Sequence, residues 1–195
     1  MRVNPITAQR RAGSLAESKP DHDYPKMLVQ NLGKRMDFTR VDLRNAFGKF
    51  ATSVCVITAA PEGFAPLGMT VNSFSSVSLN LPLVLWSLQN NSDCVPAFNA
   101  TTRFAVNILT VDQRELSEQY SRRGDHDLSA EHYVTGKTGV PILKDTLASF
   151  ECEIWQRYDG GDHVILVGKV LELASPNSTA TPLLFFSGGY QELRG

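Results

Sequence analysis

Apolar residues recur along the chain with two different spacings. Near the start of the folded sequence, Leu43, Phe47 and Phe50 lie at positions i, i+4 and i+7. They follow a Thr39-x-x-Asp42 sequence that resembles a capping box, so this segment predicts a helix with one buried face. Residues 54–60 are instead rich in β-branched side chains and end at Pro and Gly, which is typical of a strand and a turn.

The rest of the pattern is mainly that of strands. Short strands are predicted at 67–71, 74–79, 82–88, 104–109 and 182–186, and two long strands at 150–158 and 163–173. The sequence Asp159-Gly160-Gly161-Asp162 predicts a hairpin between the long strands. A short helix capped by Ser92 and a helix at 112–123 are the other predicted elements. Six or so strands with few helices predict a mainly β fold, a closed or nearly closed antiparallel barrel.

The first 36 residues differ from the remainder. They are polar, rich in Arg, Ser and Pro, and show no sustained periodicity. We therefore predict a flexible N-terminal arm over 1–36 and a single folded domain over 37–195. The alternative for the first 16 residues is a mitochondrial-type presequence, because they carry three arginines and no acid.

Composition narrows the function classes. Nineteen basic residues oppose twenty acidic ones, a net charge of -1, which argues against a nucleic-acid binder. No run of ~18 apolar residues predicts a membrane span. Three widely spaced cysteines favour a reducing compartment, here the cytoplasm, and four scattered histidines predict no metal site.

Two nucleotide-binding motifs can be tested directly on the sequence. No pair of glycines is separated by a single residue, so the Gly-x-Gly-x-x-Gly fingerprint is missing. Gly136-Lys137-Thr138 looks like the end of a P-loop, but Glu131 stands where the upstream glycine would be required. We interpret that segment as a loop.

Three local signals are candidates for chemistry. Residues 68–78 contain hydroxyl side chains and one amide between apolar residues that alternate as in a strand. Such a segment suits the binding of a planar heteroaromatic ring. The alternative is a strand whose Ser and Thr side chains face solvent. Residues 87–92 lead into a possible helix start, which is either an anion seat or a plain capped loop. His163 leaves a tight hairpin beside an acid, so it faces a pocket or is a satisfied surface histidine.

Six segments in order carry a resemblance. They are 46–58, 68–78, 82–87, 104–109, 161–163 and 182–190. Together they resemble the flavin reductase family, the small component of two-component flavin-dependent monooxygenases, over roughly residues 40–193. The resemblance implies the FMN-binding split β-barrel, antiparallel and of Greek-key type with a few flanking helices, and usually a homodimer.

The resemblance also implies site residues. The isoalloxazine ring is expected at Pro66, Leu67, Gly68, Met69, Thr70, Asn72 and Ser73. The ribityl phosphate end is expected at Ser87, Leu88, Gln89, Ser92, Asp93 and Cys94, with Gln119 and Tyr120 closing over the flavin tail. The nicotinamide is expected beside His163, Phe185, Phe186, Ser187, Gly188 and Tyr190, with His163 guiding it.

Two positions depart from the family pattern. The family often has Gly where Ser53 stands, and a basic residue where Asp93 stands. An acid beside a phosphate weakens binding, so Arg103, Arg122 or a residue of a partner chain is expected to compensate.

The function implied is an NAD(P)H-dependent flavin reductase. It transfers hydride to FMN or FAD and supplies reduced flavin to a separate oxygenase, without a metal or a covalent nucleophile. The sequence has no Arg cluster dedicated to a 2′-phosphate, which favours NADH over NADPH. The alternative is a non-enzymatic split-barrel protein that carries or senses flavin.

Overall fold

The computed structural model describes residues 37–176 and 179–193. The chain divides into two units after Thr39, and the fold below is that of the unit beginning at Arg40. The predicted arm at 1–36 lies outside the described residues, so it stays a prediction.

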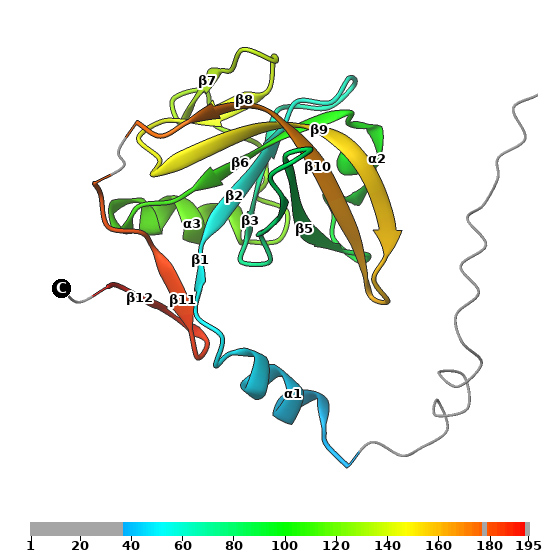
Figure 1. Cartoon of the computed structure of the whole chain (residues 1–195), viewed down its shortest axis with the longest axis vertical. Coiled ribbons are helices and arrows are strands. Elements are labelled where there is room, and N and C mark those ends of the chain that lie inside the picture. Colours follow the sequence, from blue (N-terminus) through cyan, green and yellow to red (C-terminus); the bar gives the residue numbers. More distant parts are fainter. Residues whose placement is uncertain (1–36, 177–178, 194–195) are drawn as a thin grey trace, which may run out of the picture. The chain divides into compact units, whose positions relative to one another are not determined.

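The secondary structure is mainly β (Figure 1). The helices are α1 (Arg40–Phe47), α2 (Val95–Ala100) and α3 (Arg114–Tyr120), with a 3₁₀ turn at Val111–Gln113 before α3. The first strands are β1 (Thr52–Ser53), β2 (Cys55–Ala59), β3 (Leu67–Val71), β4 (Ser75–Ser78), β5 (Leu83–Gln89) and β6 (Arg103–Ile108). The later strands are β7 (Tyr133–Thr135), β8 (Pro141–Leu143), β9 (Ala148–Asp159), β10 (His163–Ala174), β11 (Leu184–Phe186) and β12 (Gly189–Gln191).

Seven of these strands form one antiparallel sheet in the order β3-β2-β6-β9-β10-β5-β4. Strands β3 and β4 are neighbours in sequence but lie at opposite edges of this sheet. The short link between them therefore forces the sheet to curl until its edges approach each other. No backbone ladder joins the two edges within the described residues, so the barrel is split, and the predicted fold class is confirmed.

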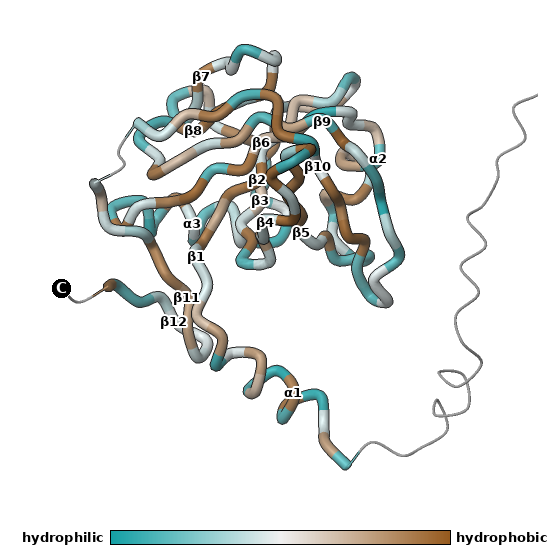
Figure 2. The backbone as a smooth tube through the Cα atoms, in the orientation of Figure 1, coloured by the Kyte–Doolittle hydropathy of each residue, from teal (hydrophilic) through white to brown (hydrophobic). Residues whose placement is uncertain are grey.

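Aromatic side chains fill the middle of the barrel. Trp86 of β5 packs edge-on against Phe98 and Phe104, with ring centroids 4.9 and 6.0 Å apart. Gly168 of β10 faces Phe104 so closely that a Cβ there would overlap the ring, so only glycine fits without a shift of that ring. The hydropathy of the two long strands differs where they pair. The first half of β10 is mainly apolar, whereas the second half of β9, which pairs with it, is mainly polar (Figure 2).

The first predicted helix exists, but its predicted burial is wrong. Helix α1 has no buried residue, and Phe47 and the following Phe50 are 69% and 77% exposed. An amphipathic pattern shows that a helix has an apolar face, but it does not say what covers that face. Within the described residues of this chain nothing covers it.

Two helix boundaries also differ from the prediction. Helix α2 starts after Cys94, and the Ser92 hydroxyl accepts the Cys94 backbone N–H at 3.2 Å instead of capping the helix. The helix predicted at 112–123 is shorter. A reciprocal capping box between Thr110 and Gln113 starts a 3₁₀ turn first, and α3 ends at Tyr120.

The loop that resembles a P-loop holds an internal carboxylate. Glu151 of β9 accepts hydrogen bonds from the backbone N–H groups of Lys137 (3.1 Å) and Thr138 (2.7 Å) and from the Thr138 hydroxyl (2.6 Å). Burial alone would raise the pKa of Glu151, but these hydrogen bonds outweigh it and hold the pKa below its ordinary value. Gly136 leaves room for the carboxylate, since a Cβ there would lie 2.7 Å from it.

Candidate functional site

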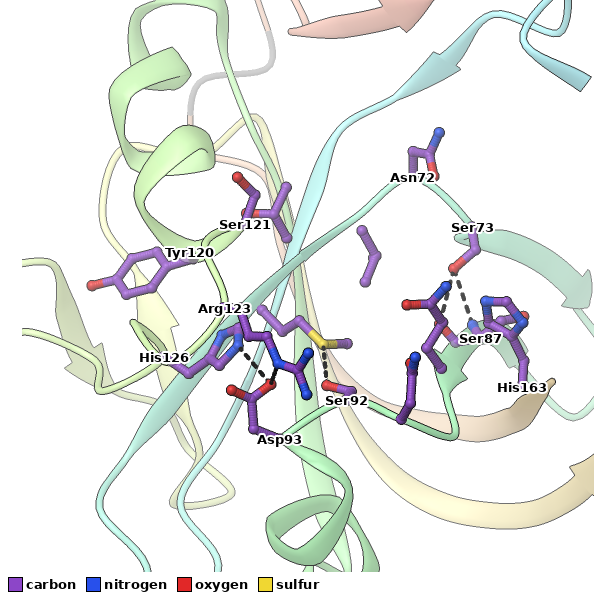
Figure 3. A pocket seen from close by; sticks show the side chains of 15 residues that line it. Asn72, Ser73, Ser87, Ser92, Asp93, Tyr120, Ser121, Arg123, His126 and His163 are labelled. Carbon is purple, nitrogen blue, oxygen red and sulfur yellow. Dashed lines mark hydrogen bonds and ion pairs between the residues drawn. The ribbon is translucent and has the colours of Figure 1, made fainter. Parts of the chain in front are cut away.

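A cavity of about 400 Å³ lies between the edge strand β3 and β5, the strand that pairs with the other edge strand, β4 (Figure 3). We call it the seam cavity. The residues that line it are Met69, Thr70, Val71, Asn72, Ser73, Ser87, Gln89, Asn91, Ser92, Asp93, Tyr120, Ser121, Arg123, His126 and His163. They come from β3, β5, the end of α3, the loops that follow these three elements, and the start of β10, so the site depends on the curling of the whole sheet.

Side chains, not a backbone ladder, hold the two walls together. The Ser73 hydroxyl accepts the backbone N–H of Ser87 on β5 at 3.0 Å, and it lies 3.4 Å from the Ser87 carbonyl oxygen. On the other side, the Thr70 hydroxyl donates to the carbonyl of Ser117 in α3 at 2.8 Å. These bonds fix the position of β3 relative to both β5 and α3.

Several polar groups of the seam cavity remain available to a ligand. Among the described residues, the side chains of Asn72, Ser87, Gln89 and Asn91 have no hydrogen-bond partner. Ser87 and Gln89 lie on one face of β5 because strand side chains alternate. Amides and hydroxyls that both donate and accept suit the edge of a planar heteroaromatic ring.

One end of the seam cavity carries charge. An oxygen of Asp93 lies 4.0 Å from Nε of Arg123 and 3.8 Å from Nε2 of His126. The other ring nitrogen of His126 lies 3.2 Å from the carbonyl oxygen of Gly68. This cluster places two groups that can carry positive charge where a phosphate could reach them, but with an acid between them.

His163 lies at another part of the rim, beside Ser87 in Figure 3. It stands opposite Gln89 in the β10–β5 register, and its Nδ1 is 2.7 Å from a carboxylate oxygen of Asp162. That hydrogen bond, together with the charge interaction, lowers the pKa of Asp162. The imidazole is partly exposed, so it is both oriented by its neighbour and accessible from the cavity.

Tyr120 is fully buried and contributes its ring, not its hydroxyl, to the seam cavity. The hydroxyl points away from the cavity (Figure 3) and is 2.7 Å from Nδ1 of His132, while it accepts the backbone N–H of Ser129 at 3.2 Å. Burial is the main cause that raises the pKa of Tyr120. The uncharged Tyr120 ring therefore forms part of the cavity wall, and its hydroxyl connects α3 to the loop after it.

A second cavity of about 720 Å³, the α1 cavity, lies between α1 and the β11–β12 turn. Its lining comprises Arg44, Asn45, Phe47, Gly48, Lys49, Phe50, Asn72, Phe185, Ser187 and Gly188. Asn72 lines both cavities, so they meet at that residue.

Most residues expected near the flavin line the seam cavity, and six do not. The six are Pro66, Leu67, Gly68, Leu88, Cys94 and Gln119. Strand alternation explains Leu88, which is 2% exposed and points into the core between Ser87 and Gln89. Cys94 is also a core residue, and burial raises the pKa of its thiol to about 11.

The residues expected near the nicotinamide divide between several places. Phe185, Ser187 and Gly188 line the α1 cavity, and His163 lines the seam cavity. Phe186 lies beneath the Lys49 ammonium, 5.9 Å from the ring centroid. The Tyr190 hydroxyl is instead 2.9 Å from the Ser117 hydroxyl, which ties the C-terminal hairpin to α3.

The cation beside Asp93 is not one of those that the sequence suggested. Arg103 donates to the Thr138 carbonyl at 3.0 Å, and Arg122 does not line the seam cavity. Arg123 and His126 occupy that position, and no residue spacing pointed to them because they stand on a loop. The sequence offered one indication for Arg123, which is the last residue of the helix predicted at 112–123.

Two further findings concern the described residues alone. No group of three or more His, Cys, Asp or Glu side chains lies close enough together to hold a metal ion. No helix among them has the length and apolar character needed to cross a membrane.

Comparisons with known proteins agree with this geometry. Residues 47–194 match the family described as flavin reductase like domain. The chain is 47% identical over 150 residues to the FMN reductase (NADH) SmoA of Agrobacterium fabrum, covering 75% of this chain and 82% of that protein. It is 36% identical over 149 residues to the reductase component of the flavin-dependent trigonelline monooxygenase of Acinetobacter baylyi, covering 76% of this chain but 47% of the relative.

A solved structure supports the same assignment. The NADH:FAD oxidoreductase SgcE6 of Streptomyces globisporus, in complex with NAD and FAD fragments, superposes with a TM-score of 0.74 at 33% identity. The match covers 80% of this chain and 93% of that one. The split barrel with a polar cavity at its seam thus defines an oxidoreductase of the flavin reductase class. The chain belongs to the flavin reductase family.

Proposed function

We propose that this protein transfers hydride from NADH to FMN or FAD and releases the reduced flavin. The seam cavity is the main support, because it offers unpartnered amide and hydroxyl groups between β3 and β5. Relatives named as NADH-dependent FMN reductase and NADH:FAD oxidoreductase support the two substrates. Both substrates carry their own redox chemistry, so the protein supplies binding, orientation and electrostatics.

The residues present fit a flavin. A cavity of about 400 Å³ falls in the range of small-molecule sites, which is roughly 300–1,000 Å³. Asn72, Ser87 and Gln89 supply donors and acceptors for the ring edge, and Met69 supplies an apolar contact. Arg123 and His126 lie at the charged end and would hold the phosphate. When bound, the flavin accepts the hydride; the chain's own residues fix its position and exclude water from one face.

His163 is proposed to guide the nicotinamide. Asp162 holds Nδ1 at 2.7 Å, and Nε2 has no hydrogen-bond partner among the described residues. An imidazole nitrogen can donate to or accept from a carboxamide, depending on its protonation. Such a group would hold the nicotinamide ring close to the flavin ring and in the right orientation. Proximity and orientation lower the activation barrier of a reaction between two bound molecules.

The reduced flavin is proposed to serve a separate oxygenase. The Acinetobacter relative is named as the reductase component of a flavin-dependent monooxygenase, which supports this role. The proposal requires that reduced flavin leaves the protein. Ultrafiltration of an anaerobic reaction mixture tests this, because reduced flavin must then appear in the protein-free filtrate. Retention of all reduced flavin on the protein would contradict it.

We further propose a homodimer in the cytoplasm. The exposed apolar side chains Leu43 and Phe47, which share one face of α1, support a second copy as the partner that covers them. Three buried free cysteines support a reducing compartment. Light scattering during size-exclusion chromatography measures the subunit count, and a monomer at micromolar concentration would refute the dimer.

A steady-state matrix of FMN and FAD against NADH and NADPH tests the proposed activity. We expect turnover with NADH and at least one flavin. The alternative, a flavin carrier or sensor, predicts that flavin raises the melting temperature while no pair of substrates turns over.

A further inference from the structure

One side chain of the seam cavity can itself be oxidised. Met69 lies on β3 and lines the cavity together with Ser92. A thioether is polarizable, and peroxides convert it to a sulfoxide, so a methionine inside a redox site is a candidate for modification. Of the four methionines in the sequence, Met69 is the one that lies within the residues described by the structure.

The Met69 side chain is held in place and remains accessible. It points to the same side of β3 as Val71, which is buried in the core of the barrel, and it packs against that core. Met69 is itself only partly buried, so solvent reaches it from the cavity. A small oxidant in the cavity therefore meets a thioether whose orientation is restricted.

The hydroxyl of Ser92 orients the sulfur. It donates to Sδ of Met69 at 3.8 Å (Figure 3), and its oxygen accepts the backbone N–H of Cys94 at 3.2 Å. A thioether sulfur has two lone pairs on opposite sides, and this hydrogen bond engages one of them. An oxidant is therefore directed to the other lone pair, and attack there forms one of the two sulfoxide epimers.

The cysteines do not compete with Met69 for an oxidant. Cys55, Cys94 and Cys152 are buried, and burial raises the pKa of their thiols to about 12, 11 and 12. Oxidants attack the thiolate, and thiols with such pKa values are hardly ionised at neutral pH. Among the described residues, Met69 is thus the sulfur that a peroxide can reach and oxidise.

We infer that Met69 is a sulfoxidation site, that its oxidant is hydrogen peroxide formed when reduced flavin reacts with dioxygen, and that the sulfoxide weakens flavin binding. This inference rests on the proposed function, which supplies the reduced flavin. Met69 provides an apolar contact in the seam cavity. A sulfoxide turns this apolar side chain into a polar one, so the same cavity holds a flavin less tightly.

The electrons and atoms of the two steps balance. Reduced flavin gives two electrons and two protons to dioxygen, which yields hydrogen peroxide and oxidised flavin. The free lone pair of the Met69 sulfur then attacks one oxygen of the peroxide. An S–O bond forms, the O–O bond breaks, and the second oxygen leaves as water. The sulfur is oxidised by two electrons, and the peroxide is reduced by two.

The test compares four proteins: the unaltered chain, Met69→Leu, Ser92→Ala and Cys94→Ala. Met69→Leu removes the sulfur, keeps an apolar side chain of similar volume and leaves the other three methionines in place. Cys94→Ala is the matched control, because it removes a different sulfur close to Ser92. Each protein is compared with its own untreated sample.

The experiment has two arms. In the first, flavin-free protein is treated with hydrogen peroxide, and peptide mass spectrometry measures oxidation at Met69. The two methionine sulfoxide reductases, MsrA and MsrB, then identify the epimer, since each reduces one of them. Fluorescence titration gives the dissociation constant of FMN before and after treatment. In the second arm, the protein turns over NADH and flavin in air, with and without catalase.

We expect peroxide to oxidise Met69 in the unaltered chain to one epimer, which one of the two reductases repairs. The dissociation constant of FMN should rise roughly two- to tenfold, the range for loss of one sulfur–aromatic contact, and should recover after repair. Cys94→Ala should respond in the same way, whereas Met69→Leu should show no change on treatment. Ser92→Ala should yield both epimers. Turnover in air should oxidise Met69, and catalase should prevent this.

Each other outcome overturns a stated part of the inference. A Met69 that stays unmodified in added peroxide, or an equal loss of FMN affinity in Met69→Leu, would refute the site. Equal amounts of both epimers in the unaltered chain would refute the role of Ser92. Oxidation by added peroxide but not during turnover would refute reduced flavin as the source. If the unaltered chain oxidises no NADH with any flavin, the proposed function fails, and the first arm still decides whether Met69 is the oxidised residue.

Discussion

Asp93 is expected to weaken the binding of phosphorylated flavins, and replacing it should tighten them. Its carboxylate stands 4.0 Å from Nε of Arg123 and 3.8 Å from Nε2 of His126, and its side chain is 40% exposed. It therefore engages the two groups that a phosphate would use, and it also repels the phosphate directly. Asp93→Asn removes both effects and keeps the size of the side chain.

The magnitude follows from distance and exposure. Two unit charges at ~4 Å interact by about 1 kcal/mol in bulk water and about 4 kcal/mol at an effective dielectric constant near 20. Arg123 is 81% exposed, so solvent screening brings the value toward that of a surface pair, up to ~1 kcal/mol. Affinity for FMN should thus rise by up to about fivefold for Asp93→Asn, and further for Asp93→Lys.

Fluorescence titration with FMN and with riboflavin measures this effect. Riboflavin has no phosphate, so its affinity should be unaltered in Asp93→Asn, and Asp112→Asn should leave both flavins unaffected as an exposed carboxylate outside the seam cavity. Arg123→Ala should weaken FMN and remove most of the gain from Asp93→Asn. The reasoning is refuted if riboflavin tightens as much as FMN, or if FMN binds more weakly.

Three further predictions concern the other groups. His163→Ala should raise KM for NADH or slow flavin reduction by roughly two- to tenfold with flavin affinity nearly unchanged; stopped-flow reduction and a melting curve check this, and a lower melting temperature with unchanged kinetics would make His163 a structural residue. Glu151 has a lowered pKa in the folded protein, so its stabilisation is complete above the ordinary pKa of ~4.3 and is lost as the pH falls through the folded-state value. Urea unfolding of Glu151→Gln should show a weaker loss of stability on acidification than the unaltered chain, and parallel pH profiles would contradict the role of the Thr138 hydrogen bonds. Gly168→Ala should lower stability by about 1–3 kcal/mol, since a Cβ must displace the Phe104 ring; an unchanged melting temperature would mean that the ring relaxes freely.

The sequence predicts the longer strands well because their signal is local, whereas the two- and three-residue strands β1, β7, β8 and β12 were not predicted. Alternation in β5 already separates Ser87 and Gln89 from Leu88, so the sequence alone indicates that the Leu88 side chain faces the core. The curling of the sheet and the seam follow less directly. They depend on β3 and β4 lying at opposite edges of the sheet. That order results from pairings between strands distant in sequence, such as β5 with β10, which have no local signature.

The charged parts of the site were harder to predict. Arg123 and His126 stand on a loop after α3, where side-chain direction depends on loop geometry and not on a period. Arg44 belongs to a helix whose pattern predicted burial, so its place beside a cavity could not be seen. Such residues become visible only when segments distant in sequence are brought together.

The open seam has a mechanical consequence. Strands β3 and β5 are linked by hydrogen bonds at Ser73 that are worth ~0.5–1.5 kcal/mol each, whereas neighbouring strands elsewhere share whole backbone ladders. The barrel therefore loosens most easily along the line where its ligands enter, without unzipping any ladder. A ligand that contacts both β3 and β5 would link these two strands. We therefore expect the barrel to be more rigid with the ligand bound than without it. We also expect a ligand to enter and leave by opening of this wall, where only side-chain hydrogen bonds have to break.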